Sequence, residues 1–157
     1  MITLFSRAFS GVAVWHRLLA TALLLLGLGW LSTAGAATTF TAADEKSVRS
    51  VVEAQLAAFA RDDAVAAFSY AAPNVRKAIG SPAVFLKLVQ NDYPVVYRPA
   101  SVAFLKPEGQ ANGAIQRVQM EDANGDSWLA TYTLQRQKNK SWRITGCSVV
   151  ENKGRMA

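Results

Sequence analysis

Residues 116–150 read QRVQMEDANGDSWLATYTLQRQKNKSWRITGCSVV, three runs of alternating side chains separated by two turn signals. Asn124-Gly125 in the first turn is the strongest short hairpin signal in the chain. A second turn near residues 138–140 leads into a strand over 142–150. Along the middle run, one face carries Trp128, Ala130, Tyr132 and Leu134. This period of two predicts antiparallel strands connected as a meander.

The chain before this stretch has the period of a helix. Apolar side chains recur at spacings of three and four over residues 42–61, and Thr41 with Asp44 forms a capping-box pattern before them. We therefore expect a long first helix over 42–61. The stripe consists of Val48, Val51, Val52, Leu56 and Phe59.

Two shorter helices are expected after the first. Asp62 or Asp63 is placed to cap the second, which would bury Val65 and Phe68 and be interrupted at Pro73. The third begins at Ser81-Pro82, because proline at the first helical position loses no hydrogen bond, and it would bury Phe85, Leu88 and Val89.

The connection from helices to strands contains two more prolines. Pro94 and Pro99 bracket an expected extended segment, residues 102–105 form a strand, and residues 106–113 form a loop. Three helices followed by four meandering strands predict an α+β fold with the helices packed on one face of an antiparallel sheet.

The first 36 residues have the three parts of a secretory signal peptide. Residues 1–17 carry Arg7, His16 and Arg17 and no acid, residues 18–31 are apolar, and small residues precede Ala37. The apolar run is shorter than the ~20 residues of a membrane-spanning helix. We expect cleavage between Ala36 and Ala37, with an uncleaved membrane anchor as the alternative. The sequence therefore predicts a periplasmic or secreted protein with one domain over residues 37–157 (core about 42–151).

The composition of residues 37–157 excludes several kinds of chemistry. Removing Arg7 and Arg17 lowers the basic residues from 17 to 15, against 11 acids, so the net charge falls from +6 to +4. This charge and the expected export argue against a nucleic-acid partner. His16 is the chain's one histidine, so catalytic triads and a histidine-ligated zinc site are excluded after cleavage. We expect no cofactor, no metal and, because Cys147 is alone, no internal disulfide. Cys147 is expected to be a small buried apolar side chain, with a reactive or intermolecular thiol as the alternative.

Four side chains are candidates for lining a pocket. Gln55 lies at the edge of the first helix's apolar stripe, where its amide needs a hydrogen-bonding partner. Trp128 and Tyr132 share a strand face, and Tyr70 ends the second helix. Aromatic walls with a few polar groups suit an apolar ligand, although core packing and a backbone-bonded glutamine explain the same residues.

Acidic side chains are the remaining candidates for catalysis. A buried carboxylate can act as a general base when burial raises its pKa. Asp62, Asp63 and Asp92 have the required chemistry, but the first two suit helix caps and the third suits a solvated turn. None is assigned as a catalytic residue.

Several short motifs resemble one bacterial family. They are QLAAF at 55–59, Asp62-Asp63, AFS at 67–69, AAP at 71–73, Phe85, Tyr93-Pro94, Arg98-Pro99, Tyr132 and WRITGC at 142–147. In this order they resemble domain of unknown function 4864 (DUF4864), which is similar in turn to the nuclear-transport-factor-2-like, or SnoaL-like, superfamily (NTF2-like). That resemblance implies a cone-shaped roll, with a curved sheet wrapped around a long first helix and a pocket between them.

The resemblance implies no activity, because NTF2-like proteins include enzymes, ligand binders and assembly domains. We expect an exported, non-catalytic module that binds a small apolar ligand or a protein partner. Two alternatives remain open: an isomerase or dehydratase that uses a buried carboxylate, and a purely structural dimerisation domain. Homodimerisation would use the sheet's outer face, to which we assign Leu129, Val149 and Arg117.

Overall fold

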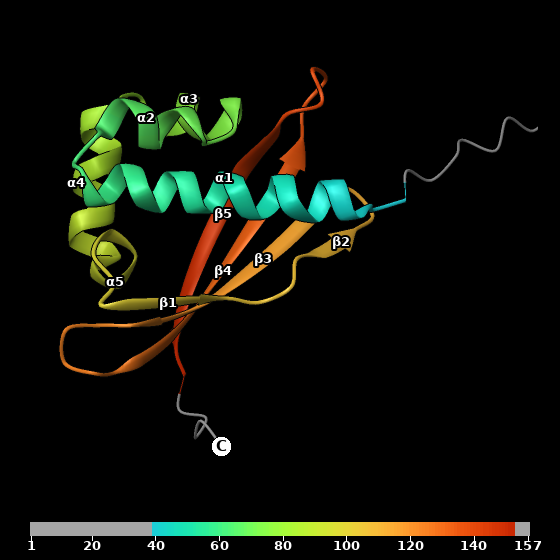
Figure 1. Cartoon of the computed structure of the whole chain (residues 1–157). Helices are drawn as coiled ribbons and strands as arrows, with labels where there is room; N and C mark the ends of the chain where they lie inside the picture. The colour runs from blue at the N-terminus through green and yellow to red at the C-terminus, as the bar shows by residue number, and fades with distance from the viewer. Residues whose placement is uncertain (1–38, 153–157) are drawn as a thin grey trace, which may run out of the picture. The chain divides into compact units, whose positions relative to one another are not determined.

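Helices precede strands along residues 39–152, the part of the chain that the computed structural model describes (Figure 1). The helices in this part are α1 (Ala42–Ala60), α2 (Ala64–Ser69), α3 (Pro73–Ile79), α4 (Pro82–Asp92) and α5 (Pro94–Tyr97). The strands are β1 (Ser101–Phe104), β2 (Glu108–Gln110), β3 (Gly113–Glu121), β4 (Ser127–Arg136) and β5 (Trp142–Glu151). The predicted α+β class is confirmed, with more elements than expected.

Helix α1 begins and buries its face as its sequence predicts. The Thr41 hydroxyl accepts the Asp44 amide at 3.2 Å, and the Thr41 amide donates to the Asp44 carboxylate at 3.1 Å, which completes the capping box. The apolar stripe faces the core, where Val48 and Val52 are fully buried. Burying each such side chain stabilises the fold by roughly 1.5–3 kcal/mol.

Two prolines begin helices where the sequence predicted none. Pro73 was expected to interrupt a helix, and Pro94 to open an extended connection, but each occupies the first turn of a short helix, α3 and α5. Proline cannot continue the helix before it, because its ring clashes with the preceding turn, but its fixed φ fits the first turn of a new helix. The same residue can therefore end one helix and begin the next. The prediction that Val65 is buried is also wrong, because it is 70% exposed on the outer side of α2.

The strands form one antiparallel sheet in the order β1-β3-β4-β5, and β2 pairs with β3 beyond β1. Both predicted turns are confirmed. In the β3–β4 turn, Gly125 adopts φ 85° and its amide donates to the Asp122 carbonyl at 3.1 Å. In the β4–β5 turn, the Gln137 amide donates to the Ser141 carbonyl at 2.8 Å. Strand β2 was not predicted, because its three residues are all exposed and lie within the expected loop 106–113.

One face of the curved sheet packs against the helices. Helix α1 runs across this inner face, and α2, α4 and α5 gather near its C-terminal end (Figure 1). The predicted inner residues Ala130, Tyr132 and Leu134 of β4 are each at most 1% exposed. They pack with α1 residues in the hydrophobic core, so the helix stripe and the sheet face cover each other.

Strand β5 contains a β-bulge that changes which side chains face inward. The register passes from Leu134 opposite Ile144 to Thr133 opposite Gly146, so Thr145 is an extra residue. After the bulge, Cys147 lies opposite the buried Tyr132 and therefore shares its inner face. By the same register Val149 lies opposite the buried Ala130, so its predicted place on the outer face is wrong.

The other predictions about the outer face hold. Leu129 and Arg117 alternate with buried neighbours and lie on the side away from the helices. Arg117 forms an ion pair with Glu108 of β2. Homodimerisation through this face stays a prediction.

The predicted signal peptide, residues 1–36, and its cleavage site between Ala36 and Ala37 lie outside the described residues. Across residues 39–152, every helix is too short or too polar to cross a lipid bilayer.

Candidate functional site

A cavity of about 150 Å³ lies between α1, the helices α3 and α4, and the inner face of β4 and β5. Its walls are mostly aliphatic and aromatic. The lining residues are Gln55, Phe59, Ala71, Val75, Ile79, Phe85, Leu88, Val89, Tyr93, Val96, Tyr132, Ile144, Gly146 and Cys147. We call this space the inner cavity. All of these side chains lack a formal charge when their tyrosines and cysteine are protonated.

Gln55 lies on the wall that α1 contributes, and it is 3% exposed. Its Nε2 donates to the backbone carbonyl of Ala67 at 3.1 Å. Ala67 belongs to the last turn of the six-residue helix α2, where carbonyl groups lack partners within the helix. Gln55 therefore completes the hydrogen bonding of α2, and it also lines the inner cavity.

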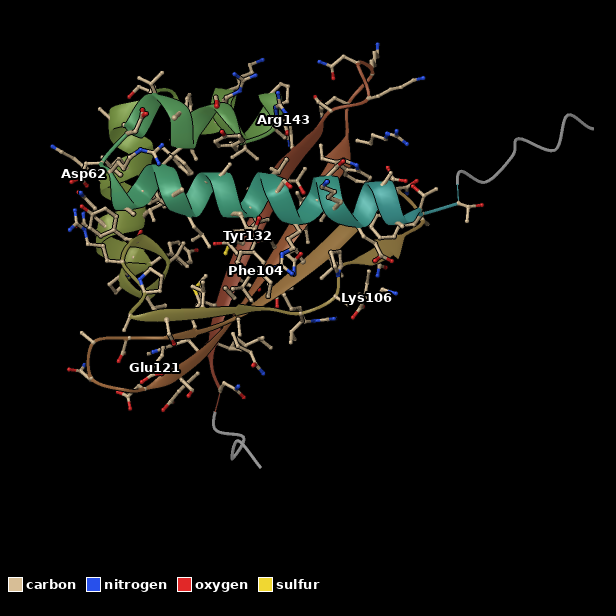
Figure 2. The ribbon with its side chains drawn as sticks, in the orientation of Figure 1. Asp62, Phe104, Lys106, Glu121, Tyr132 and Arg143 are labelled. Carbon is tan, nitrogen blue, oxygen red and sulfur yellow. The ribbon has the colours of Figure 1, made fainter. Side chains whose placement is uncertain are left out.

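Tyr132 lies on β4 where the sheet runs behind α1, and its side chain is 1% exposed (Figure 2). Its hydroxyl has no partner with hydrogen-bonding geometry in the described part of the chain. Burial, and to a lesser degree the neighbouring Cys147 thiol, raise the pKa of Tyr132 well above its usual value. The hydroxyl therefore keeps its proton and can act as a hydrogen-bond donor.

Cys147 faces Tyr132 across the β4–β5 pair and lines the same cavity. Burial raises the pKa of the Cys147 thiol to about 12, and the Tyr132 hydroxyl opposes this rise only in part. The thiol is therefore neutral at physiological pH. A neutral, partly buried thiol is a poor nucleophile and behaves as a small apolar group.

The structure separates the four side chains that the sequence grouped as pocket candidates. Gln55 and Tyr132 meet at the inner cavity. Trp128 lines a different and wider cleft of about 420 Å³ with Asp92 and Arg98. Tyr70 lines neither space, and its backbone carbonyl instead accepts the Ile144 amide at 2.9 Å. The grouping was wrong because it assumed that Trp128 and Tyr132, which share one face of β4, border the same pocket.

The cleft beside Trp128 is organised by a turn. The indole Nε1 donates to the Asp122 carboxylate at 2.9 Å, and the amides of Asn124 and Asp126 donate to the same side chain. The Trp128 hydrogen bond, followed by these amide bonds, lowers the pKa of Asp122. Asp122 is thus ionised and fully engaged in holding the β3–β4 turn.

The predicted carboxylates are placed as caps or at the surface. Asp63 is the N-cap of α2 and accepts the Ala66 amide at 2.9 Å, as predicted. Asp62 has φ 55° and pairs with Arg98 at 2.9 Å, and the Tyr97 hydroxyl donates to it. Asp92 is exposed at the end of α4.

Asp44 is the one acid of the described chain that is buried, at 8% exposure. Hydrogen bonds from the Thr41 amide and hydroxyl lower its pKa, and Arg136 lies 3.5 Å away. A general base needs a raised pKa, so the geometry suits Asp44 to capping rather than to proton transfer. Residues 39–152 contain no cluster of three side chains with metal-binding chemistry.

Most of the inner cavity was not predicted. Phe59, Phe85 and Val89 were expected to be buried, but their periodicity gives no sign that they border an empty space. Val75 and Ile79 come from α3, a helix missed at Pro73. Cys147 was expected to be a buried apolar group, and only the bulge at Thr145 turns it toward Tyr132.

The fold and site define an α+β domain in which helices on one face of an antiparallel sheet border a mostly apolar, partly open cavity. The chain belongs to the family described as Domain of unknown function (DUF4864), whose model matches residues 41–157. The resemblance to this family is confirmed. The match covers the described helices and strands.

Two solved structures described as NTF-2-like proteins of unknown function are similar to the chain. The one from Silicibacter pomeroyi DSS-3 is 17% identical, with a TM-score of 0.47, and the match covers 68% of this chain and 94% of that chain. The one from Burkholderia xenovorans LB400 is 15% identical, with a TM-score of 0.46, and the match covers 72% and 88% of the two chains. No functionally curated protein matches.

Proposed function

We propose that this protein is an exported, non-catalytic binding domain that takes a small apolar ligand into the inner cavity. The observation that carries the proposal is the cavity's lining: ten of its fourteen residues are apolar or glycine, and the other four, Gln55, Tyr93, Tyr132 and Cys147, are polar side chains other than Asp, Glu, Lys or Arg. Ligand sites are typically apolar with a few polar groups that fix orientation.

The cavity's size also supports a ligand. An apolar cavity of about 150 Å³ in another protein stays free of water and binds benzene or xenon. The inner cavity has this volume and a mostly apolar lining, with four polar side chains and an opening to the surface. Val75 and Ile79 of α3 and Leu88 of α4 are partly exposed, which offers a route of entry from the surface between these helices.

Export is supported by the sequence of residues 1–36, with its basic start, apolar run and small residues before Ala37. A ligand met outside the cytoplasm would be a diffusible small molecule. The side chain of a partner protein could enter the same space, and the experiment below separates the two.

The first test is native mass spectrometry of the protein purified after expression of the full chain, with and without organic extraction. An excess mass lost on extraction identifies a bound small molecule, and the measured polypeptide mass shows whether residues 1–36 were removed. Amide chemical-shift changes on titration with benzene then locate binding. We expect the changes to centre on the residues that line the inner cavity.

A matched pair of variants controls the titration. Cys147→Leu places a larger side chain into the cavity, whereas Ser148→Leu adds the same side chain at the next, exposed position of β5. Benzene binding should be lost in Cys147→Leu and kept in Ser148→Leu. If benzene gives no saturable shifts in the wild type, or if both variants bind it equally, the proposal is wrong.

An enzyme that uses a buried carboxylate receives no support from this site. No acidic side chain lines the inner cavity, and the buried Asp44 lies in a helix cap beside a different space of about 220 Å³.

A further inference from the structure

The geometry points to a more specific ligand: a neutral molecule about the size of one six-membered ring that carries a hydrogen-bond acceptor, such as a carbonyl oxygen, received by the Tyr132 hydroxyl. This inference rests on the proposed function, because it assigns the chemistry of the ligand in the inner cavity. It uses a polar group that the fold leaves unpaired.

Tyr132 supplies the donor. Its side chain is 1% exposed and lines the cavity, yet its hydroxyl has no partner with hydrogen-bonding geometry in the described residues, and the Cys147 thiol that interacts with it is only a weak acceptor. A buried polar group without a partner is costly, and native proteins satisfy most such groups. Phenylalanine would fill the same place on β4 without this cost. A ligand acceptor at this position would satisfy the hydroxyl.

The other polar groups of the cavity are partly engaged, weak or less buried. The Gln55 amide donates to Ala67 at 3.1 Å. The Cys147 thiol contacts the Ser148 carbonyl at a long 4.0 Å and is a weak donor in any case. Tyr93 also lines the cavity, but it is only partly buried and borders the wider cleft as well. The Tyr132 hydroxyl is therefore the fully buried strong donor of the cavity, and it accounts for one acceptor on the ligand.

The lining excludes charged ligands. The cavity has no lysine, arginine, aspartate or glutamate, and the raised pKa values keep Tyr132 and Cys147 neutral. An ion moved into such a site loses its hydration without gaining a partner charge. Carboxylates and ammonium ions of the right size should therefore fail to bind.

The volume limits the ligand's size. A cavity of about 150 Å³ accommodates benzene. By the same comparison, roughly six to eight non-hydrogen atoms fill it. Larger polycyclic molecules would require α3 or α4 to move outward.

The test compares two ligands of equal shape in two proteins. Cyclohexanone and methylenecyclohexane each have seven non-hydrogen atoms and differ in the carbonyl oxygen. Dissociation constants are measured by amide chemical-shift titration for the wild-type protein and for Tyr132→Phe. We expect Tyr132→Phe to raise the dissociation constant of cyclohexanone about three- to tenfold, which is the range of a net hydrogen bond. The dissociation constant of methylenecyclohexane should change less than twofold. For each ligand, the ratio of the dissociation constants of the variant and the wild type is compared. The hydration free energy of the ligand cancels in this ratio, because the same ligand binds both proteins.

Tyr70→Phe is the matched control, because Tyr70 does not line the inner cavity. It should leave both constants unchanged, and protonated cyclohexylamine should not bind any of the proteins. If Tyr132→Phe changes the dissociation constants of the two ligands by the same factor, the inference is wrong while the proposed function stands. If neither ligand binds the wild type, both are wrong.

A measurement on the wild type covers the case in which Tyr132→Phe fails to fold. The carbonyl stretch of bound ¹³C-labelled cyclohexanone should move to lower frequency than in hexane, because a hydrogen bond weakens the C=O bond. A frequency equal to that in hexane would overturn the inference.

Discussion

Gln55 of α1 donates its side-chain amide to the backbone carbonyl of Ala67, twelve residues later in α2, at 3.1 Å. The Ala71 amide, which would bond Ala67 if the helix continued, donates to Phe68 instead. A side chain from one helix thus completes the end of another. It also links α2 to α1, the helix that contributes Gln55 and Phe59 to the lining of the inner cavity.

Replacing Gln55 should therefore destabilise the fold. Gln55→Leu leaves the Ala67 carbonyl buried without this partner, and we expect a loss of about 1–3 kcal/mol in the free energy of unfolding. Urea denaturation measures this loss. Gln90→Leu, a partly exposed glutamine on α4, should change stability by less than ~0.5 kcal/mol. Equal effects of the two substitutions would contradict the assigned role.

The capping box of α1 predicts a pH dependence. The pKa of Asp44 is lowered from 3.8 in the folded state, so its hydrogen bonds stabilise the protein fully above about pH 4 and are lost as the pH falls through the folded-state value. Asp44→Asn should cost about 0.5–2 kcal/mol at pH 7. It should also flatten the fall in stability as the pH drops below about 4. A fall as steep as that of the wild type would argue against Asp44 as its source.

Cys147 should resist alkylation. Its pKa of about 12 leaves almost no thiolate at pH 8, and the thiolate is the reactive form. We expect the rate of reaction with iodoacetamide in the folded protein to be at least ~100-fold below that in urea at pH 8, because each pKa unit lowers the thiolate fraction tenfold. The folded rate should keep rising up to pH 10. A plateau near pH 9 would show an ordinary thiol.

Gly113 at the start of β3 cannot accept a larger residue without movement. A Cβ atom at this position would lie 2.2 Å from the Leu134 carbonyl oxygen of β4. Gly113→Ala should therefore cost about 1–3 kcal/mol, because backbone rather than a flexible side chain must shift. Asn112→Ala, at the exposed neighbouring turn position, should change stability by less than ~0.5 kcal/mol. Thermal denaturation of the two variants compares them directly.

Local sequence signals predicted the regular elements and failed at the short ones. The α1 stripe, the capping box and the Asn124-Gly125 turn depend on neighbouring residues only, and each is present as expected. Helix α5 and strand β2, with four and three residues, are too short to show a period. Helix α3 was missed because a proline that ends one helix also begins the next.

By itself, the sequence determined the α+β class and the inward face of β4, because these follow from the periodicity of apolar side chains. Only the tertiary structure decided that Gln55, Tyr132 and Cys147 border one cavity while Trp128 borders another. For Cys147, the physical reason is the extra residue Thr145, since one inserted residue reverses the faces of a strand and turns Cys147 inward. The empty space beside it depends on how helices and sheet meet, which no local period encodes.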